Sequence, residues 1–355
     1  MISSDALQFL QSFLACPSPS GYEQPAQAVW RDRTAPFVDR IETDVHGNSM
    51  AWIHPDTRPR VLFTGHCDEL GFQIRYIDDN GFLYFATIGG HDIGLVPGRT
   101  VTIHTANGPL PGVIGKRAIH LMSPDDRKKV PEIHELWIDI GVADKAEAQS
   151  LVSIGDPATY DHSFKPLRGS LASSRAFDDR AGAFIVSEVL RRVSSQKSAL
   201  RCGVVGVSTV QEEIGLRGAT TSAFSTSPDI GIALDVTHAT DHPDVDKRKV
   251  GEVRLGGGPV ICRGANINPR VFTLLVETAK AESIPFQLEA EPRGTGTDAN
   301  AIQLARGGIA AGLIGLPLRY MHTPNEVIDL EDLDQTASLL VAFLKRIGPD
   351  TNLIP

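Results

Sequence analysis

The chain has 355 residues, of which 41% are hydrophobic and 22% are charged, proportions that exclude a disordered or fibrous protein. This length exceeds what a single hydrophobic core usually serves, so two domains are expected. The 43 acidic and 34 basic side chains give a net charge of -9, which leaves no basic footprint for nucleic acid, so no such partner is expected.

The first segment of the chain is expected to form an amphipathic helix. Ser3 or Ser4 can cap it, and Leu7, Leu10 and Leu14 fall on one face. The segment lacks the basic region and continuous apolar run of a secretory signal, and no stretch approaches the roughly 20 apolar residues of a membrane span. The four cysteines are scattered without CxxC spacing, which fits a reducing compartment. We therefore expect a cytoplasmic protein that does not bind membranes.

The chain changes character after its first 68 residues. Before that point, a helix is expected over 24–37 and a buried strand over 60–64. From about residue 70 to residue 167, short β-forming runs are separated by Gly, Pro, Asn and Asp. In this stretch strands are expected over 71–77, 82–88, 100–105, 112–120 and 136–141, with a helix over 144–152.

Helices and strands alternate in the last part of the chain. Helices are expected over 179–193, 268–283, 298–306 and 330–347, and strands over 201–209, 230–236 and 309–315. Such alternation is typical of a mostly parallel sheet covered by helices on both faces. We therefore predict an α/β catalytic domain formed by residues 1–68 and 168–355, with a β-rich domain inserted at 69–167.

Polar residues gather where these strands end. In open α/β sheets, functional residues lie just beyond the carboxyl ends of the strands. The residues found at those points, or at the start of the helix over 179–193, are His66, Asp68, Asp178, Asp179, Glu212, Glu213, Asp235 and His322.

Each of these signals has an ordinary explanation when it is taken alone. A single histidine such as His66 is usually just hydrogen-bonded, and a pair such as Glu212 and Glu213 is usually a solvated surface feature. Carboxylates at a helix start, such as Asp178, complement the helix dipole. Together, however, imidazole and carboxylate groups suit zinc, cobalt or manganese, and divalent cations offset the repulsion within an acidic cluster.

Six segments resemble the M42 family of metallo-aminopeptidases, which includes the tetrahedral-shell peptidases. In chain order they are TGHCDELGF, AFDDRAG, QEEIGLRGA, ALDVTHATD, GTGTDANAIQLARGGI and LRYMHTPNEV, and the resemblance extends over essentially the whole chain. It implies a zinc-peptidase-like fold with a β-rich insert that serves oligomerisation or substrate access. It also implies peptide substrates cleaved at their amino end, two divalent ions per chain (zinc or cobalt), and a homo-oligomer built of dimers, with a dodecamer as one form.

The resemblance implies five metal ligands in this chain. The terminal ligands of one ion are His66 and Asp235, and those of the other ion are Glu213 and His322. Asp178 bridges the two ions, which suits a carboxylate because its two oxygens can span metals about 3.5–4 Å apart.

The resemblance also implies the catalytic groups. Glu212 is the general base that takes a proton from metal-activated water and returns it to the leaving amine. Asp68 fixes the tautomer of His66, because a ligand histidine needs its other ring nitrogen held. Thr297 and Asp298 help to shape the substrate pocket, although a helix cap and turn would explain these two residues equally well.

Two segments depart from the family pattern. Members commonly carry an aromatic residue after the paired glycines of the insert, where this chain has Gly89-Gly90-His91. Members also often have Lys-Ala before the bridging aspartate, where this chain has Arg175-Ala176-Phe177. Neither segment includes an implied ligand, so the departures bear on assembly and specificity rather than on the chemistry.

Other functions were weighed against the aminopeptidase. A deacylase, a carboxypeptidase or an endoglucanase-labelled relative could use the same scaffold. A metal-free retaining glycosidase needs two carboxyl groups about 5–5.5 Å apart, such as Glu212 and Glu213, but it leaves the histidines and aspartates without a purpose. A non-catalytic scaffold protein would be expected to have lost a ligand or the base, and none is missing.

Overall fold

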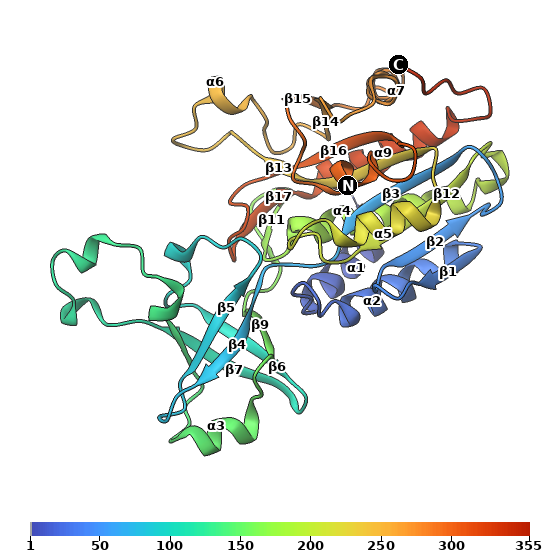
Figure 1. Cartoon of the computed structure of the whole chain (residues 1–355). Helices are drawn as coiled ribbons and strands as arrows, with labels where there is room; N and C mark the ends of the chain where they lie inside the picture. The colour runs from blue at the N-terminus through green and yellow to red at the C-terminus, as the bar shows by residue number, and fades with distance from the viewer. Residues whose placement is uncertain (1) are drawn as a thin grey trace.

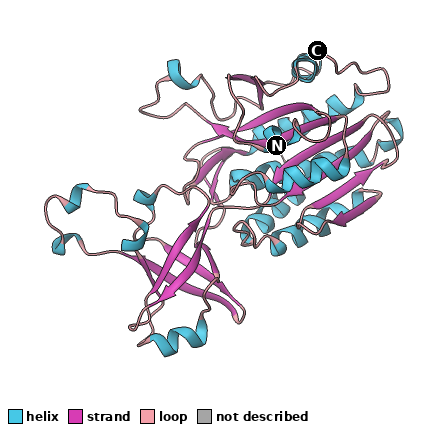
Figure 2. Cartoon of the chain, viewed as in Figure 1, coloured by secondary structure: helices cyan, strands magenta, loops and turns pink. Residues whose placement is uncertain are grey.

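The computed structural model describes residues 2–355 and has two visibly different parts (Figure 1). One part is a layered assembly in which helices flank a large sheet. The other part is made mostly of strands and projects from the first (Figure 2). Within residues 2–355, no helix combines the length and the apolar character that crossing a bilayer requires.

The large sheet has eight strands, and its centre is made of long buried segments. In spatial order the strands are β1 (Arg40–Thr43), β2 (Ser49–Ile53), β12 (Gly203–Thr209), β3 (Arg60–His66), β13 (Ile230–His238), β16 (Ala310–Leu318), β14 (Val260–Gly264) and β15 (Gln287–Glu291). Every residue of β12 is buried, as expected for a strand covered on both faces.

The directions of these strands are mixed. The central strands β12, β3, β13 and β16 are parallel to one another, and β14 is parallel to β15. The pairs β1–β2, β2–β12 and β14–β16 are antiparallel. The prediction of an α/β fold is confirmed, whereas the mostly parallel sheet is confirmed only for the four central strands.

Helices cover both faces of the large sheet. One hydrophobic cluster joins the sheet to α1 (Ser4–Ala15), α2 (Gln24–Thr34), α4 (Phe177–Ser194), α7 (Pro269–Ala281) and α9 (Leu330–Lys345). A second cluster joins it to α5 (Arg217–Thr226) and α8 (Asp298–Ile302). The short α6 (Lys247–Val250) lies in the connection between β13 and β14. The predicted cap of the first helix is present, since the Ser3 side chain accepts the N–H of Ala6 at 3.2 Å.

The projecting part contains a closed barrel with a hydrophobic core of its own. Around the barrel the strands are β4 (Gly71–Ile77), β5 (Leu83–Ile88), β8 (Trp137–Asp139), β7 (Gly108–Gly115), β6 (Thr100–Thr105) and β9 (Pro157–Tyr160). The helix α3 (Lys145–Leu151) packs at its end (Figure 1). The strand expected over 112–120 instead ends at Gly115. The domain boundaries at 69 and 167 stay a prediction.

A small three-stranded sheet pairs the strand that precedes α4 with a strand near the end of the chain. Its order is β10 (Lys165–Pro166), β11 (Leu171–Ser174) and β17 (Glu326–Asp329). Short 3-10 helices occur at Ala35–Phe37, Ile93–Leu95, Ile119–Leu121, Asp126–Lys128, Ile133–Glu135 and Lys197–Ala199. The first of these continues α2, so the single helix expected over 24–37 is an α-helix followed by a 3-10 helix.

Candidate metal centre

Two of the predicted ligands lie on neighbouring parallel strands, His66 at the end of β3 and Asp235 within β13. The last registered pair between β3 and β13 is Thr64 with Ala233, and His66 and Asp235 each lie two residues further along. Side chains alternate between the two faces of a strand. His66 therefore lies on the same face of the sheet as Thr64, and Asp235 on the same face as Ala233. The side chains are almost completely buried, with exposed fractions of 2% for His66 and 6% for Asp235.

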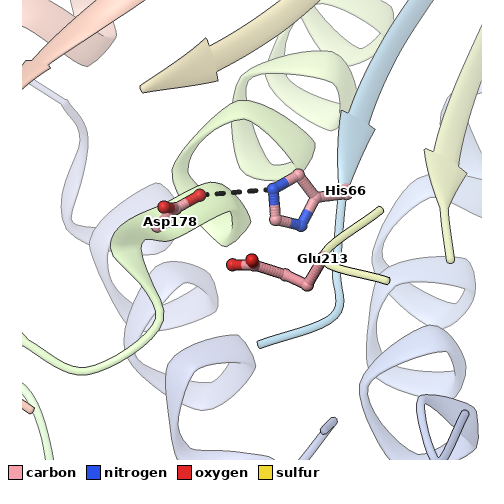
Figure 3. Close-up of side chains that lie close together, drawn as sticks. All are labelled: His66, Asp178 and Glu213. Carbon is pink, nitrogen blue, oxygen red and sulfur yellow. Dashed lines mark ion pairs between the residues drawn. The ribbon is translucent and has the colours of Figure 1, made fainter. Parts of the chain in front are cut away.

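Asp178 lies between the two predicted histidines. Its Oδ1 is 3.2 Å from Nε2 of His66, and its Oδ2 is 3.3 Å from Nε2 of His322. Figure 3 shows the first of these contacts, with Glu213 beside it. Each carboxylate oxygen of Asp178 therefore faces a different imidazole, as a bridging ligand requires.

Glu213 completes this side of the cluster. Its Oε2 is 3.6 Å from Nε2 of His322, and its Oε1 is buried with no hydrogen-bond partner among the described residues. His66, Asp178 and Glu213 each offer one ligand atom, and the three atoms lie within 4.8 Å of one another. A buried acceptor without a donor is costly unless a cation occupies the space in front of it.

Asp179 belongs to a second group of three possible ligands. Atoms of His66, Asp179 and Asp235 also lie within 4.8 Å of one another. The Asp179 carboxylate accepts the N–H of His66 at 3.2 Å and that of Gly182 at 3.0 Å. The sequence marked Asp179 only as charge at a helix start, and its adjacency to Asp178 was the one available signal.

Asp68 supports both the histidine and the glutamate pair. Its Oδ1 lies 3.4 Å from Nδ1 of His66, and its main-chain carbonyl oxygen lies nearer to that atom, at 3.1 Å. The same carboxylate accepts the N–H groups of Glu212 and Glu213, at 3.0 and 3.2 Å, and the hydroxyl of Ser20 at 2.6 Å. Asp68 is therefore placed to orient four neighbours, three of which were not expected from the sequence.

Glu212 points to the same centre without joining either ligand group. Its Oε2 is 3.8 Å from Nε2 of His66. Burial raises the pKa of Glu212 to about 10; His66 opposes this rise, and the carboxylates of Asp235 and Asp298 add to it. In the metal-free site Glu212 is therefore a neutral acid at neutral pH, and a role as general base requires nearby cations, which favour its carboxylate form.

The electrostatics of the cluster favour cations. Burial and the nearby Asp178 raise the pKa of Glu213 to about 8, and burial raises that of Asp235 well above its usual range. Burial would lower the pKa of His66, but the carboxylates of Glu212 and Asp178 raise it well above its usual value. Without metal, the site therefore binds protons in place of cations. The donor set of imidazole and carboxylate groups fits divalent metal ions such as zinc or cobalt.

Glu326 lies in the segment LRYMHTPNEV, but the resemblance implies no role for it. Its Oε2 accepts the N–H of Asp178 at 3.1 Å, and its Oε1 accepts the N–H of His322 at 3.2 Å. Burial, together with the charges of Asp178 and Glu213, raises its pKa well above the usual range. Its position four residues after His322 was the only signal in the sequence.

A cavity of about 500 Å³ opens beside these residues. Thr297 lines it, as predicted. Asp298 is not among the lining residues, since its carboxylate accepts the hydroxyl of Thr209 at 2.7 Å and is 1% exposed. The lining residues are Asp178, Glu212, Glu213, Gly215, Leu216, Asp235, Val236, Thr237, His238, Gly296, Thr297, Met321 and His322.

Both departures from the family pattern have a structural explanation. His91 stacks on Phe72, with ring centroids 4.6 Å apart, so it takes the place of an aromatic side chain. Burial lowers the pKa of His91 to about 4, which keeps its ring neutral. Arg175 binds both carboxylate oxygens of Glu69, at 2.8 and 2.7 Å, in a buried ion pair.

Comparison with known proteins identifies the family. The family model described as M42 glutamyl aminopeptidase matches residues 47–339. The chain belongs to the M42 family of peptidases. This M42 peptidase is 32% identical to the lysyl aminopeptidase of Pyrococcus furiosus over 346 residues, which cover 96% of this chain and 97% of that protein.

Two solved structures of TET peptidases resemble the whole chain. The TET aminopeptidase from a marine sediment archaeon of the Thaumarchaeota is 32% identical, with a TM-score of 0.93 and 98% of each chain covered. The TET1 peptidase of Pyrococcus horikoshii, described as able to assemble into a tetrahedron or a large octahedral shell, is 31% identical. Its TM-score is 0.85, with 96% of this chain and 99% of that one covered.

These matches confirm the predicted kind of protein. This M42 peptidase is an enzyme that hydrolyses peptide bonds, and its family is metal-dependent. The alternative of a non-catalytic scaffold protein is therefore wrong.

Proposed function

We propose that this M42 peptidase removes the first residue of peptides with the help of two divalent metal ions. In this proposal His66 and Asp235 hold one ion, Glu213 and His322 hold the other, and Asp178 bridges them. The observation that carries the proposal is the position of Asp178, whose two oxygens lie 3.2 and 3.3 Å from the Nε2 atoms of two different histidines.

The side chains around the ions divide the chemistry. When bound, the two ions make a water molecule more acidic and polarise the carbonyl group of the scissile bond. Glu212 accepts the proton of the attacking water and delivers it to the leaving amine. Asp68 holds the main chain of Glu212 and the ring of His66, so the base and the ligand keep a fixed relative position.

The cavity supports cleavage at a free amino terminus. Glu212, Glu213 and Asp235 line it, and the ammonium group of an unblocked peptide would bind there beside the metal ions and a carboxylate. Thr297 lines another part of the wall, where it can contact the substrate. Asp298 does not line the cavity and would act indirectly, through the hydrogen bond that it accepts from Thr209.

We further propose that the protein works as a cytoplasmic homo-oligomer. The resemblance to the Pyrococcus horikoshii peptidase that assembles into shells supports an assembly, and a dimer-built dodecamer is the form that we expect. The barrel part would serve oligomerisation or substrate access, because it projects from the layered part (Figure 1).

A substrate panel with controlled metal content tests the proposed function. Metal is removed from the purified protein with a chelator, and zinc or cobalt is added back. The protein is then assayed on peptides and aminoacyl amides, on the same compounds with acetylated amino groups, and on carboxymethyl cellulose. We expect about two ions per chain and turnover of the unblocked substrates only. Full activity with fewer than one ion per chain, or equal cleavage of acetylated peptides, would contradict the proposal.

A further inference from the structure

We propose that Glu326 is a positioning residue that locks together the two chain segments that deliver Asp178 and His322. The inference rests on the proposed metal centre and adds to it a residue that touches neither ion. Glu326 acts through main-chain N–H groups, one on each ligand residue.

The first segment reaches Glu326 through the small sheet. Ser174 of β11 is paired with Glu326 of β17, and the chain continues from Ser174 into the start of α4. Four residues after Ser174, the N–H of Asp178 donates to Oε2 of Glu326 at 3.1 Å. The carboxylate therefore fixes the main chain of the bridging residue at the point where sheet gives way to helix.

The second segment is a tight loop that returns from β16 to β17. Arg319 and Val327 close it by exchanging two main-chain hydrogen bonds of 3.0 and 3.1 Å. Within the loop Tyr320 and His322 have φ angles of +64° and +61°, which are costly for residues with a Cβ atom. The N–H of His322 donates to Oε1 of Glu326 at 3.2 Å, so this carboxylate stabilises a conformation that the loop would otherwise avoid.

The chemistry of the contact requires a carboxylate. Both partners of Glu326 are N–H donors, and only a carboxylate of this length accepts on both of its arms. A glutamine has the same shape, but one of its arms would be an NH2 group that faces a donor. The 3% exposed Glu326 lies close to Asp178 and Glu213, where a further negative charge is unfavourable in itself. The two hydrogen bonds that Glu326 accepts, one from each ligand segment, explain why a carboxyl group stands at this position.

The test compares three variants. Glu326→Gln keeps the shape and loses one acceptor, whereas Glu326→Asp keeps both acceptors on a shorter side chain. The matched control is Glu331→Gln, which makes the same chemical change at an exposed position in the first turn of α9. Cobalt and zinc binding are measured by calorimetry, and thermal unfolding is measured with and without metal.

We expect Glu326→Gln to weaken binding of the ion held by Glu213 and His322 by about 10- to 100-fold. We expect Glu326→Asp to recover part of that loss and Glu331→Gln to change nothing. In the metal-free protein the unfolding temperature of Glu326→Gln should change little, because the side chain keeps its shape and one of its two acceptors. The increase in unfolding temperature on adding metal should shrink.

The outcomes separate positioning from general stability. A purely structural glutamate would lower the unfolding temperature equally with and without metal and leave the affinity unchanged, and that result would overturn the inference. If Glu326→Gln does not fold, the inference is overturned when Glu326→Asp binds metal as tightly as the control does. If the unaltered protein and all three variants bind two ions with the same affinity, this inference fails and the proposed function stands. If the unaltered protein binds no metal, the proposed function fails with it.

Discussion

The two sides of the metal centre are built in different ways. On the strand side, His66 ends β3 and Asp235 lies within the adjacent β13, and the two residues are 2% and 6% exposed. On the loop side, Glu213 follows β12 and His322 lies in a loop, with its side chain 37% exposed. The sheet fixes the strand side directly. The loop side depends on hydrogen bonds that the N–H groups of Glu213 and His322 donate to Asp68 and Glu326.

This difference implies that the two ions are held unequally. Strand ends inside a packed sheet have little freedom to move, whereas a half-exposed loop opens more easily. We therefore expect the ion on the loop side to bind more weakly and to leave first when a chelator is added. The bridging Asp178, which faces both sides, couples their occupancies.

The largest expected effect comes from two neighbouring glutamates. Glu212→Gln should lower kcat by about 10²- to 10⁴-fold, because the base is lost, while both ions stay bound. Glu213→Gln makes the same chemical change one residue further on, and it should release the ion on the loop side. Turnover and metal content are measured together, and near-normal turnover of Glu212→Gln would refute its role as the base.

The next effect compares the two histidines. His322→Ala should leave about one ion per chain on the strand side, because only one of the two proposed sites has lost a terminal ligand. His66→Ala should disturb the buried side, where the imidazole also contacts Asp68 and Asp178, and should lower the unfolding temperature more. Metal analysis and calorimetry check both. Equal metal loss in the two variants would show that the sides are not built differently.

A smaller effect concerns pH in the metal-free protein. Folding raises the pKa of Glu213 from 4.5 to about 8 and that of Glu212 to about 10, so the folded state binds protons more tightly than the unfolded state. The pKa of His322 is raised from 6.5 to about 9, chiefly by its hydrogen bond to Asp178, and it acts in the same direction. Stability should therefore fall as the pH rises from about 5 to about 8.

Metal should reverse this trend, since cations replace the bound protons and prefer deprotonated ligands. Thermal unfolding at several pH values, with and without zinc, measures the difference. The stabilisation by zinc should grow as the pH rises. The lowered pKa of Asp178 acts only in more acidic solution. A metal-free protein whose stability does not change between about pH 5 and about pH 8 would contradict the view that the site binds protons in place of cations.

The smallest expected effect concerns the residues of the barrel part that lie close to His322. Added to Gly90, a Cβ atom would lie 3.6 Å from Nδ1 of His322, and the next residue is His91. His91→Phe should keep the stack on Phe72 but lose the hydrogen bond to the carbonyl of Gly71, costing about 1 kcal/mol of stability. Denaturant unfolding measures this cost, and kcat should not change. His91→Ala, which also loses the stack, should be less stable than His91→Phe.

The central strands of the fold were predictable because they are continuous apolar runs. The strands expected over 201–209 and 230–236 correspond to β12 and β13. Strand direction was not predictable, since hydrophobicity reports burial and not orientation, and β14 runs antiparallel to β16. The helix α5 was missed because its Thr and Ser residues are weak helix formers, and packing of Ala219 and Ala223 against the sheet stabilises it.

The candidate site followed a similar rule. The residues at strand ends could be proposed from the sequence because the carboxyl ends of parallel strands meet at one edge, and the structure brings them together. Asp179 and Glu326 accept N–H groups from distant segments, and sequence spacing does not encode such contacts. Their roles, like those of the proposed ligands, now await the measurements described above.

The ligand residues are spread widely along the chain. His66 lies in the first fifth of the sequence and His322 in the last tenth, and β16, which leads to His322, pairs directly with β13 at the centre of the large sheet. A chain interrupted before that strand lacks both a ligand and a central part of its sheet. Incomplete copies of this peptidase, whether arrested in synthesis or trimmed by other proteases, should therefore be inert rather than partly active.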